Sequence, residues 1–390
     1  MAKTKRVLWL HTQPEHYFNL LIDALNAASE IEYIAGFMSR GPGLYKDVPV
    51  PAASRSLFLR PKKGMEGRPA AGFRGIHEDW QEDIAPLDIH AGIIAGYAGA
   101  TQRQFIHTLH RQGKPVLMMS DSNIRSQRGH GWGPALRRRV KRLALGPIIR
   151  DTDVLLTMNM RGVAYWRYFG APKSKIVLCP FYADYARIEG GRRSERSAVL
   201  ARFPIPQDKR IILTAARLVP AKGLDLMLDA FRQAGLADRG YIYCIAGTGP
   251  LEAELKARAG DALDRSIFFL GFTQPSDLMP LLCHSDLFVL PSVYEPHGIV
   301  IGEAAAAGTP LLCSDVCGAA PDLVVAGRSG LMFHSGQARD LLGKLRVLTA
   351  DPARLRSMRP TTRAVFEEWF GRTNPVKVVD LAVKRLLGPQ

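Results

Sequence analysis

The stretch EPHGIVIGEAAAAGTPLLCSD, residues 295–315, follows the short apolar run SDLFVLPS and ends in a second apolar run, PLLCSD. A Pro-His-Gly break separates the first run from GEAAAA, residues 302–307, which has high helix propensity. Gly308, followed by Pro310, is typical of a helix end. The stretch therefore predicts a strand, a loop, a helix and a second strand, which is the repeating unit of a parallel sheet.

Two glutamates flank this break. Glu295 is expected in the loop and Glu303 in the first turn of the helix. A helix N-terminus carries about half a positive charge and free N–H groups, so it favours a ligand with phosphates. Hydroxyl groups of the same ligand would suit the two acids. The alternative is that Glu303 only complements the helix dipole and Glu295 is a solvated loop residue.

The same alternation of strand and helix patterns runs through the whole chain. Its N-terminal half contains the strand-like runs KRVLWLHT, IEYIAGF, AGIIAGY, PVLMMSD, DVLLTMN and IVLCPF, and the pattern restarts with RIILTAARL. A chain of 390 residues also exceeds the roughly 250–300 residues at which a single core stops growing. We predict an α/β protein of two doubly wound, parallel-sheet Rossmann-like domains that face a cleft.

The boundaries follow from composition. Residues 1–186 form the N-terminal domain, and residues 206–372 form the C-terminal domain. The Arg-rich segment 187–205 is predicted to be the linker. The amphipathic segment 373–390 is predicted to be a helix that packs back on the N-terminal domain.

The composition limits the partners and the compartment. The net charge of +16 favours anionic partners, such as phosphorylated molecules or an anionic membrane surface. Five scattered cysteines without CxxC spacing indicate buried thiols in a reducing cytoplasm. No apolar run reaches the roughly 18 residues of a spanning helix. We expect a cytoplasmic protein, at most peripheral on the inner face of the cell membrane.

Charged and glycine-rich loops follow the C-terminal strand patterns. Arg217 and Lys222 follow ILTAA, where two cations would clamp a diphosphate, although a solvated basic loop is the alternative. Gly247 and Gly249 follow YCIAG and allow a close approach of the backbone to a ligand. They do not form a dinucleotide fingerprint, because Glu252 stands where a third glycine is needed.

In order, these loops resemble the retaining GT-B glycosyltransferases of family 4, the glycosyl transferases group 1. RLVPAKG is similar to that family's R-L-x-x-x-K-G, AGTGP to its A-G-x-G-P and LGF to its base-side turn. EPHGIVIGEAAAAGTP is similar to its E-P-F-G-L-x-x-x-E-A-x-A-x-G-x-P. The resemblance is specific over roughly residues 205–345. It implies a GT-B fold with a nucleotide-sugar donor in the C-terminal domain and the acceptor in the N-terminal one.

The resemblance also implies roles for the matched residues. Arg217 and Lys222 would hold the donor diphosphate, and Glu303 would hold the ribose hydroxyls. Glu295 would hold the transferred sugar together with the backbone N–H groups of the following turn. His297 replaces the usual Phe and is expected to tune the choice of donor. The donor-binding residues expected in full are Arg217, Lys222, Gly247, Gly249, Gly271, Phe272, Glu295, His297, Gly298, Ile299, Val300 and Glu303.

The N-terminal half matches the family only in outline. Asp121 stands where many relatives have a histidine, so it is expected to bind the reacting sugar or the acceptor, or else to cap the next turn. His16 is a second acceptor-side candidate, with a helix-start histidine as the alternative. The catalytic candidates are thus Glu295, Asp121, Arg217 and Lys222. The DTD at 151–153 mimics a metal-binding motif, but its position favours a turn, and we expect no metal.

A basic segment lies in the N-terminal half. Residues 122–150 contain eight Lys or Arg and no Asp or Glu. Within it, LRRRVKRL (136–143) has the pattern of a basic amphipathic helix. We expect it to contact an anionic membrane surface or a lipid-diphosphate acceptor, or to be a solvated face packed on the sheet.

The resemblance implies a retaining glycosyltransferase, and we expect it to need no cofactor. Its donor is a nucleotide-diphosphate-sugar, with a UDP-sugar favoured and a GDP-sugar as the second choice. Its acceptor is a glycan or a lipid-linked molecule of bacterial polysaccharide or glycolipid synthesis. The alternatives are a nucleotide-sugar 2-epimerase of the same fold, or a catalytically silent nucleotide-sugar-binding protein. Nucleic acid is not expected, because aromatic residues are not interleaved with the basic ones.

Overall fold

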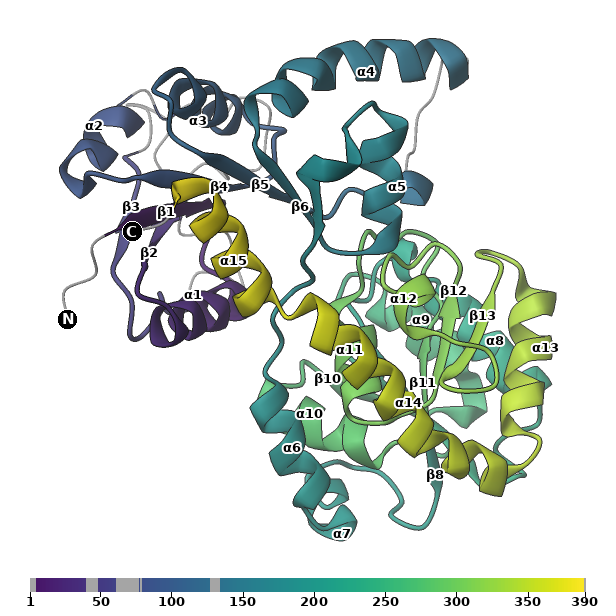
Figure 1. The fold of residues 1–390 in the computed structure, drawn as a ribbon. Helices are drawn as coiled ribbons and strands as arrows, with labels where there is room; N and C mark the ends of the chain where they lie inside the picture. The colour runs from purple at the N-terminus through teal and green to yellow at the C-terminus, as the bar shows by residue number, and fades with distance from the viewer. Residues whose placement is uncertain (1–4, 40–47, 61–76, 78, 127–133, 389–390) are drawn as a thin grey trace. The chain divides into compact units, whose positions relative to one another are not determined.

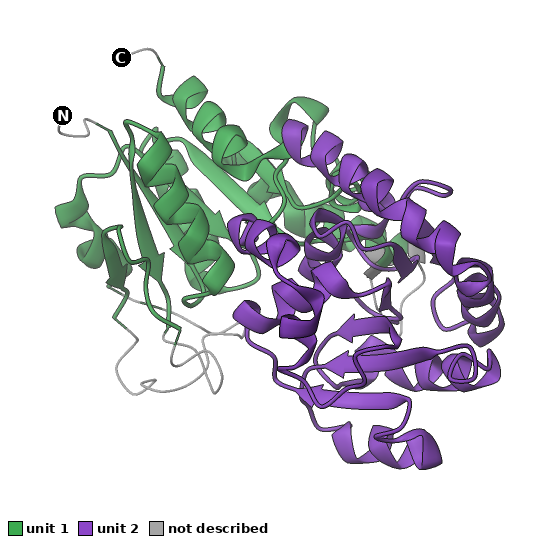
Figure 2. Cartoon of the chain, turned by 90° about the horizontal axis from the view of Figure 1, so that it is seen from below, with its two compact units in different colours: residues 1–182, 373–390 green, residues 183–372 purple. Residues whose placement is uncertain are grey.

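The computed structural model describes residues 5–39, 48–60, 77, 79–126 and 134–388. The chain divides into two compact units (Figure 2). The first unit is Met1–Tyr182 with Thr373–Gln390, and the second is Ala183–Arg372. Each unit is built on one parallel sheet with helices on both faces, and the prediction of two Rossmann-like domains is confirmed.

The first unit contains a seven-stranded sheet in the order β3-β2-β1-β4-β5-β6-β7 (Figure 1), and all its paired strands are parallel. From the central neighbours β1 and β4 the chain runs outward in both directions, as in a doubly wound sheet. The strands are β1 Arg6–His11, β2 Glu32–Phe37, β3 Ser56–Phe58, β4 Ala91–Ala95, β5 Val116–Ser120, β6 Val154–Thr157 and β7 Ile176–Leu178.

Successive side chains of β1 enter different cores. Val7 and Trp9 pack with α1 and α15 on one face of the sheet, whereas Leu8 and Leu10 pack with α2, α3, α4 and α5 on the other. This alternation is what a strand buried on both faces requires. The helices are α1 His16–Ala28, α2 Trp80–Ile84, α3 Ala100–Arg111, α4 Pro134–Asp151, α5 Met160–Tyr168 and α15 Pro375–Leu387, with short 3-10 turns η2 Ala85–Leu87, η3 Ile124–Ser126 and η4 Lys173–Lys175.

The second unit contains a six-stranded parallel sheet in the order β10-β9-β8-β11-β12-β13. β8 and β11 are the central neighbours, so the direction of winding reverses between them. The strands are β8 Arg210–Ala215, β9 Tyr241–Ala246, β10 Ile267–Gly271, β11 Leu287–Leu290, β12 Leu311–Ser314 and β13 Gly330–Phe333.

Two apolar cores cover the faces of this second sheet. α6, α10 and α11 contribute to one core, and α8, α9 and α13 contribute to the other. The helices are α6 Tyr185–Arg193, α7 Arg196–Leu200, α8 Leu224–Gln233, α9 Glu252–Ala259, α10 Pro275–His284, α11 Ile299–Ala306, α12 Ala320–Leu323, α13 Ala338–Thr349 and α14 Pro352–Thr373, with 3-10 turns η5 Pro220–Lys222 and η6 Gly260–Ala262.

The segment 187–205, expected as a linker, is largely helical and belongs to the second unit. Ile188 and Leu200 are buried in its core. A Cβ on Gly191 would lie 2.8 Å from Pro280 Cα, so α6 packs closely on α10. The Arg-rich composition predicted a linker, but the apolar residues between the arginines are enough to anchor two short helices.

The C-terminal helix α15 belongs to the first unit and packs on α1. Val379 and Val383 are fully buried in the core that contains α1. Asp380 accepts hydrogen bonds from the hydroxyl groups of Tyr33, at 3.1 Å, and of Ser29. Burial, followed by the charge of Asp380, raises the pKa of Tyr33 well above its usual range, so this hydroxyl is a donor at neutral pH.

All five cysteines are buried and none of them forms a disulfide, as their scattered spacing predicted. Burial raises the pKa of the Cys179 and Cys244 thiols to about 12, so they are protonated at neutral pH.

Within the described ranges, no helix combines the length and the apolar character that crossing a lipid bilayer requires.

Candidate functional site

The site in the second unit is centred where the winding of its sheet reverses. Ligands of doubly wound sheets bind beyond the carboxyl ends of the strands at this point. In this unit the loops after β8 and β11 meet at the switch point. The carbonyl of Ala221 in the first loop accepts hydrogen bonds from the N–H groups of Val293, at 2.9 Å, and Tyr294, at 3.1 Å, in the second. The two loops therefore form one connected surface.

Gly223 makes this contact possible. Its φ is +60°, and a Cβ on it would lie 2.4 Å from the carbonyl oxygen of Pro291. No other residue type combines this left-handed conformation with so close an approach of two backbones. The glycine of the RLVPAKG motif is thus required by packing between the two loops.

Gly223→Ala is expected to destabilise the second unit strongly, and Gly235→Ala is the matched control. Gly235 has almost the same φ, +61°, but no atom lies within 4 Å of the position of its Cβ. The control should cost only the left-handed strain of alanine, about 1–2 kcal/mol. Gly223→Ala should cost roughly 1–3 kcal/mol more because of overpacking. Thermal unfolding of the two variants compares these costs, and equal shifts in melting temperature would contradict the packing role.

A lysine and a glutamate from the two loops form an ion pair. The Nζ of Lys222 donates a hydrogen bond to Oε2 of Glu295, and the two side chains are only 20% and 12% exposed. The sequence placed both residues in one site but did not predict their direct contact. Arg217, at the start of the same loop as Lys222, is exposed. The site therefore presents a cation and a carboxylate side by side, with a second cation nearby in the chain.

The glycines after β9 allow the backbone of the loop after β8 to pack closely against them. A Cβ on Gly247 would lie 2.0 Å from the carbonyl oxygen of Ala216, and one on Gly249 would lie 2.4 Å from that of Leu218. Leu218 N–H donates to the carbonyl of Thr248 at 2.9 Å, which fixes this contact. The position of these glycines after a strand predicted the close approach of a ligand. The structure shows that packing against the loop after β8 requires them first.

The turn after β10 exposes an aromatic ring. Gly271 has a φ of +68°, and its carbonyl accepts a hydrogen bond from Gly247 N–H at 2.7 Å. Phe272 follows and is 56% exposed, which is unusual for a side chain of its size. The predicted base-side turn is therefore joined to the loop after β9 and presents a flat apolar surface beside it.

The helix of the opening stretch begins earlier than its composition indicates. α11 begins at Ile299, after Gly298 with a φ of +86° at its N-cap. Glu303 is consequently its fifth residue and lies in the second turn, so the prediction of the first turn was wrong. The helix includes the apolar residues before the alanine-rich run, so Ile299 and Val300 belong to its first turn. Glu303 is 1% exposed and cannot be a solvated dipole partner.

His297 is buried beside this helix start. Burial lowers its pKa to about 4, so the imidazole is neutral at physiological pH. Its carbonyl accepts a hydrogen bond from Ala319 N–H at 2.8 Å, and that of Glu295 accepts one from Gly318 N–H at 3.2 Å. This supporting turn was not predicted from the sequence. The sequence signal for this turn is the run of small residues CGAA (317–320), which begins three residues after β12 ends at the same edge of the sheet.

The acceptor-side candidates lie at the carboxyl edge of the sheet in the first unit. Asp121 follows β5 and is exposed. The turn after it is capped by Asn123, whose Oδ1 accepts from Arg125 N–H at 2.8 Å. His16 is the first residue of α1, and its Nε2 is buried without a hydrogen-bond partner among the described residues.

The two aspartates of the DTD motif have structural partners. Asp151 is buried and contacts Arg150 at 2.7 Å and His107 at 2.9 Å, while Asp153 accepts a hydrogen bond from Val116 N–H at 2.8 Å. Both precede β6 and therefore lie at the amino end of the strand, opposite the edge where the loops of a site gather. Asp151 thus ties the end of α4 to α3, and Asp153 ties the start of β6 to β5.

The basic segment forms α4, with residues 127–133 and the Arg137 side chain outside the described part of the structure. Arg138 lies over the ring of Tyr168, 4.1 Å from its centroid, and Lys141 lies over the ring of Tyr165. Burial lowers the pKa of Lys141. The helix also exposes apolar side chains together with the basic residues Arg139 and Arg142. These apolar side chains are Leu136, Val140 and Leu143.

Comparison with known proteins agrees with this arrangement. The family model described as glycosyl transferases group 1 matches residues 196–365. A glycogen synthase of Mycobacterium tuberculosis is 30% identical over 320 residues, which cover 80% of this chain and 71% of that protein. A GDP-mannose-dependent monoacylated alpha-(1-6)-phosphatidylinositol monomannoside mannosyltransferase of Corynebacterium glutamicum is 27% identical over 308 residues, covering 76% and 73%.

Solved structures share the fold. HepE of Anabaena in complex with UDP has a TM-score of 0.69 at 15% identity, covering 98% of this chain and 99% of that one. A glycosyltransferase of Rickettsia africae has a TM-score of 0.75 at 12% identity, covering 99% and 100%. With a relative at 30% identity over most of both chains and a family model that matches the second unit, the chain belongs to the glycosyl transferases group 1 family and is a glycosyltransferase of the GT-B fold.

Proposed function

We propose that this enzyme transfers a sugar from a nucleotide-diphosphate-sugar to a glycan or lipid-diphosphate-linked acceptor of bacterial polysaccharide or glycolipid synthesis, with retention of configuration. The observation that carries the proposal is the Lys222–Glu295 pair at the switch point. It sets a cation suited to a diphosphate beside a carboxylate suited to sugar hydroxyls. The solved complexes of HepE with UDP and with UDP-glucose support a UDP-sugar, and the Corynebacterium mannosyltransferase keeps a GDP-sugar as the second choice.

Each part of the donor has a partner in this proposal. Lys222 and Arg217 bind the diphosphate, and the start of α11 adds backbone N–H groups with the positive end of the helix dipole. Glu303 accepts hydrogen bonds from the ribose hydroxyls, and Glu295 accepts them from the transferred sugar. Phe272 offers its exposed ring to the base. Neutral His297 shapes the turn proposed to bind the sugar.

The chemistry proposed is front-face displacement. The bond between the anomeric carbon and the diphosphate oxygen breaks, and the acceptor oxygen bonds to the same face of that carbon. The acceptor proton passes to the leaving phosphate. Lys222 and Arg217 stabilise the charge that develops on this leaving group, so no metal is needed. In the first unit, Asp121 and His16 orient the acceptor or the reacting sugar.

A turnover assay tests this function. UDP- and GDP-sugars are incubated with candidate glycan and lipid-linked acceptors, and both free nucleotide and glycosylated product are measured, with and without EDTA. Acceptor-dependent product formation that survives EDTA and keeps the donor's anomeric configuration is expected. Free sugar released without any acceptor would favour a 2-epimerase instead, and tight donor binding without turnover would favour a silent binding protein.

We also propose that α4 docks on an anionic membrane surface and brings the enzyme to a lipid-linked acceptor. Leu143 is 72% exposed, and Leu136 and Val140 are exposed on the same helix. Such side chains insert into a membrane interface, while neighbouring arginines bind anionic headgroups. Arg138 and Lys141 pack on aromatic rings of their own unit, so Arg139 and Arg142 carry the docking.

Replacing Arg139 and Arg142 with serine is expected to weaken sedimentation with anionic vesicles by roughly tenfold or more, since each basic residue near such a surface contributes about 1 kcal/mol. The matched control replaces Arg103 and Arg111, two exposed arginines of α3, and should keep wild-type binding. Binding should also fall steeply with salt. If both double variants bind the vesicles equally well, the basic residues of α4 form a solvated face and do not dock on a membrane.

A further inference from the structure

A cationic cavity lies in the second unit at the amino end of its sheet, opposite the edge where the loops of the proposed donor site meet. It has a volume of about 530 Å³ and opens where β8 begins and just before β9 and β11. The donor loops follow the carboxyl ends of these same strands. β8 has six residues, so roughly 20 Å of strand separates the two places. The positive side chains around the cavity are Arg196, Lys209, Arg210, Arg356 and Arg359.

Backbone carbonyls hold two arginines of this cavity, Arg359 and Arg196. Arg359 donates to the carbonyls of Ser285, at 2.5 Å, and Cys283, at the C-terminal end of α10. Arg196 donates to the carbonyls of Gln207 and, at 2.8 Å, Lys209. Carbonyls orient a guanidinium but do not cancel its charge. Burial lowers the pKa of Arg359, which means that its charge lacks the stabilisation that water would give.

Carboxylates balance only part of this charge. Asp208 lies 3.4 Å from Lys209, and Oδ2 of Asp286 accepts a hydrogen bond from Ile211 N–H at 2.8 Å. Burial raises the pKa of Asp286. His284, also in the lining, has its pKa lowered by burial and then by Arg359. Five cations thus face two carboxylates, which leaves an excess of positive charge inside a concave surface.

We propose that this cavity binds a small phosphate-bearing molecule of the sugar-phosphate class, at a site separate from the donor site. Its volume lies in the 300–1,000 Å³ range of small-molecule sites. Guanidinium groups pair with phosphate oxygens in forked geometry, and backbone carbonyls already hold Arg196 and Arg359 in place. The polar lining also suits the hydroxyl groups of a sugar. A phosphate dianion would neutralise most of the excess charge.

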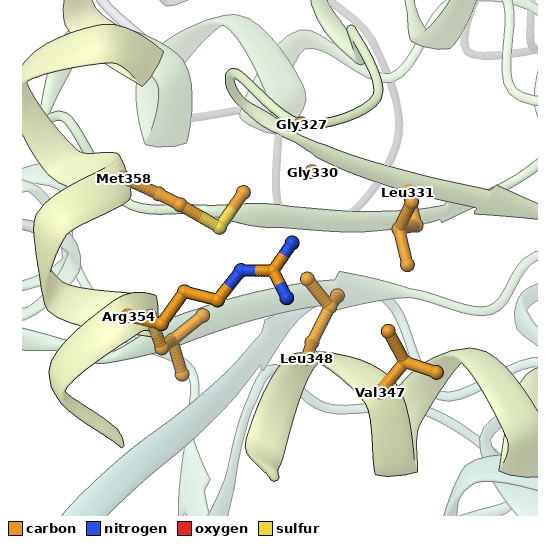
Figure 3. A pocket seen from close by; sticks show the side chains of 8 residues that line it. Gly327, Gly330, Leu331, Val347, Leu348, Arg354 and Met358 are labelled. Atoms are coloured by element: carbon orange, nitrogen blue, oxygen red, sulfur yellow. The ribbon is translucent and has the colours of Figure 1, made fainter. Parts of the chain in front are cut away.

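A neighbouring pocket provides a contrast and a control. It has a volume of about 50 Å³ and is lined by apolar residues of β13, α13 and α14, with a single arginine, Arg354 (Figure 3). This volume is too small for a sugar phosphate. Arg354 and Arg356 are both exposed and lie two positions apart on α14, but only Arg356 lines the cationic cavity. No hydrogen bond of Arg356 is found among the described residues, so its removal should spare the fold.

Isothermal titration calorimetry with glucose 6-phosphate and with inorganic phosphate tests the proposal. Wild type, Arg354→Ala and Arg217→Ala should bind both with the same dissociation constant. Arg356→Ala should bind at least fivefold more weakly, and Arg356→Ala combined with Lys209→Ala at least twentyfold. Melting temperatures within a few degrees of wild type would show that the variants are folded.

Two results would overturn the proposal. The first is no heat of binding from either phosphate with wild-type protein. The second is binding that falls in Arg217→Ala but not in Arg356→Ala, because the phosphate would then occupy the site after β8. Since no turnover is measured, neither result depends on whether the protein transfers sugar as proposed.

Discussion

Glu295→Gln is expected to lower the rate of sugar transfer by a factor on the order of a hundred or more, while a nucleotide diphosphate still binds. The substitution keeps the size of the side chain but removes its charge. In the proposed complex Glu295 touches the transferred sugar and Lys222, and it does not touch the nucleotide. Its loss should therefore act on the reaction and not on the affinity for the nucleotide.

Glu252→Gln provides the control for this experiment. Glu252 begins α9 after the neighbouring loop and pairs with Lys256 at 2.7 Å, so it too is a glutamate in an ion pair with a lysine, but its side chain is 32% exposed. Its replacement should leave the rate near that of wild type. Steady-state rates together with calorimetric titration of the nucleotide separate the two effects. Equal loss of rate and nucleotide affinity in Glu295→Gln would show that Glu295 only maintains the loop.

Lys222→Ala is expected to lower both the rate and the affinity for nucleotide diphosphate. Losing a preorganised cation at a leaving group typically costs on the order of a hundredfold in rate. Losing a charge-assisted hydrogen bond to the diphosphate weakens binding by about 1.5–3 kcal/mol. The variant also leaves the largely buried Glu295 without its lysine. The affinity for nucleotide thus distinguishes Lys222→Ala from Glu295→Gln.

The double variant of Lys222 and Glu295 reports on their contact. Residues in one ion pair couple, so the combined loss in rate should be smaller than the product of the single losses. Lys256→Ala, which breaks the corresponding pair on α9, is the control and should change neither rate nor nucleotide affinity. If the loss in rate of the double variant equals the product of the two single losses, the two residues do not act as a unit.

Much of the fold was predictable because its strands are buried on both faces. Such strands are continuous apolar runs, and the helices between them fix a parallel sheet. β3 was not predicted, because Ser56–Phe58 is a three-residue edge strand with no run of its own. The helices of 187–205 were missed for a different reason. They contain too few apolar residues to show a helical periodicity in the sequence, and these residues are buried only because the helices pack on α10.

The site was predictable as a set of loops but not as a set of contacts. Motif order placed Lys222, Glu295 and Glu303 at one sheet edge. The pairing of Lys222 with Glu295 depends on the approach of two backbones at Gly223, which the sequence does not reveal. The position of Glu303 was off by one turn, because the apolar residues before the alanines hide the true helix start.

The most direct test of the proposed donor site is calorimetric titration of UDP, GDP and ADP into wild type and Glu303→Gln. Glutamine fills the volume of this buried side chain but loses the charge that would hold the ribose hydroxyls. At least one nucleotide should bind wild type, and Glu303→Gln should weaken it by about tenfold or more, as expected for a lost charge-assisted hydrogen bond. Failure of all three nucleotides to bind, or an unchanged dissociation constant in the folded variant, would contradict the account.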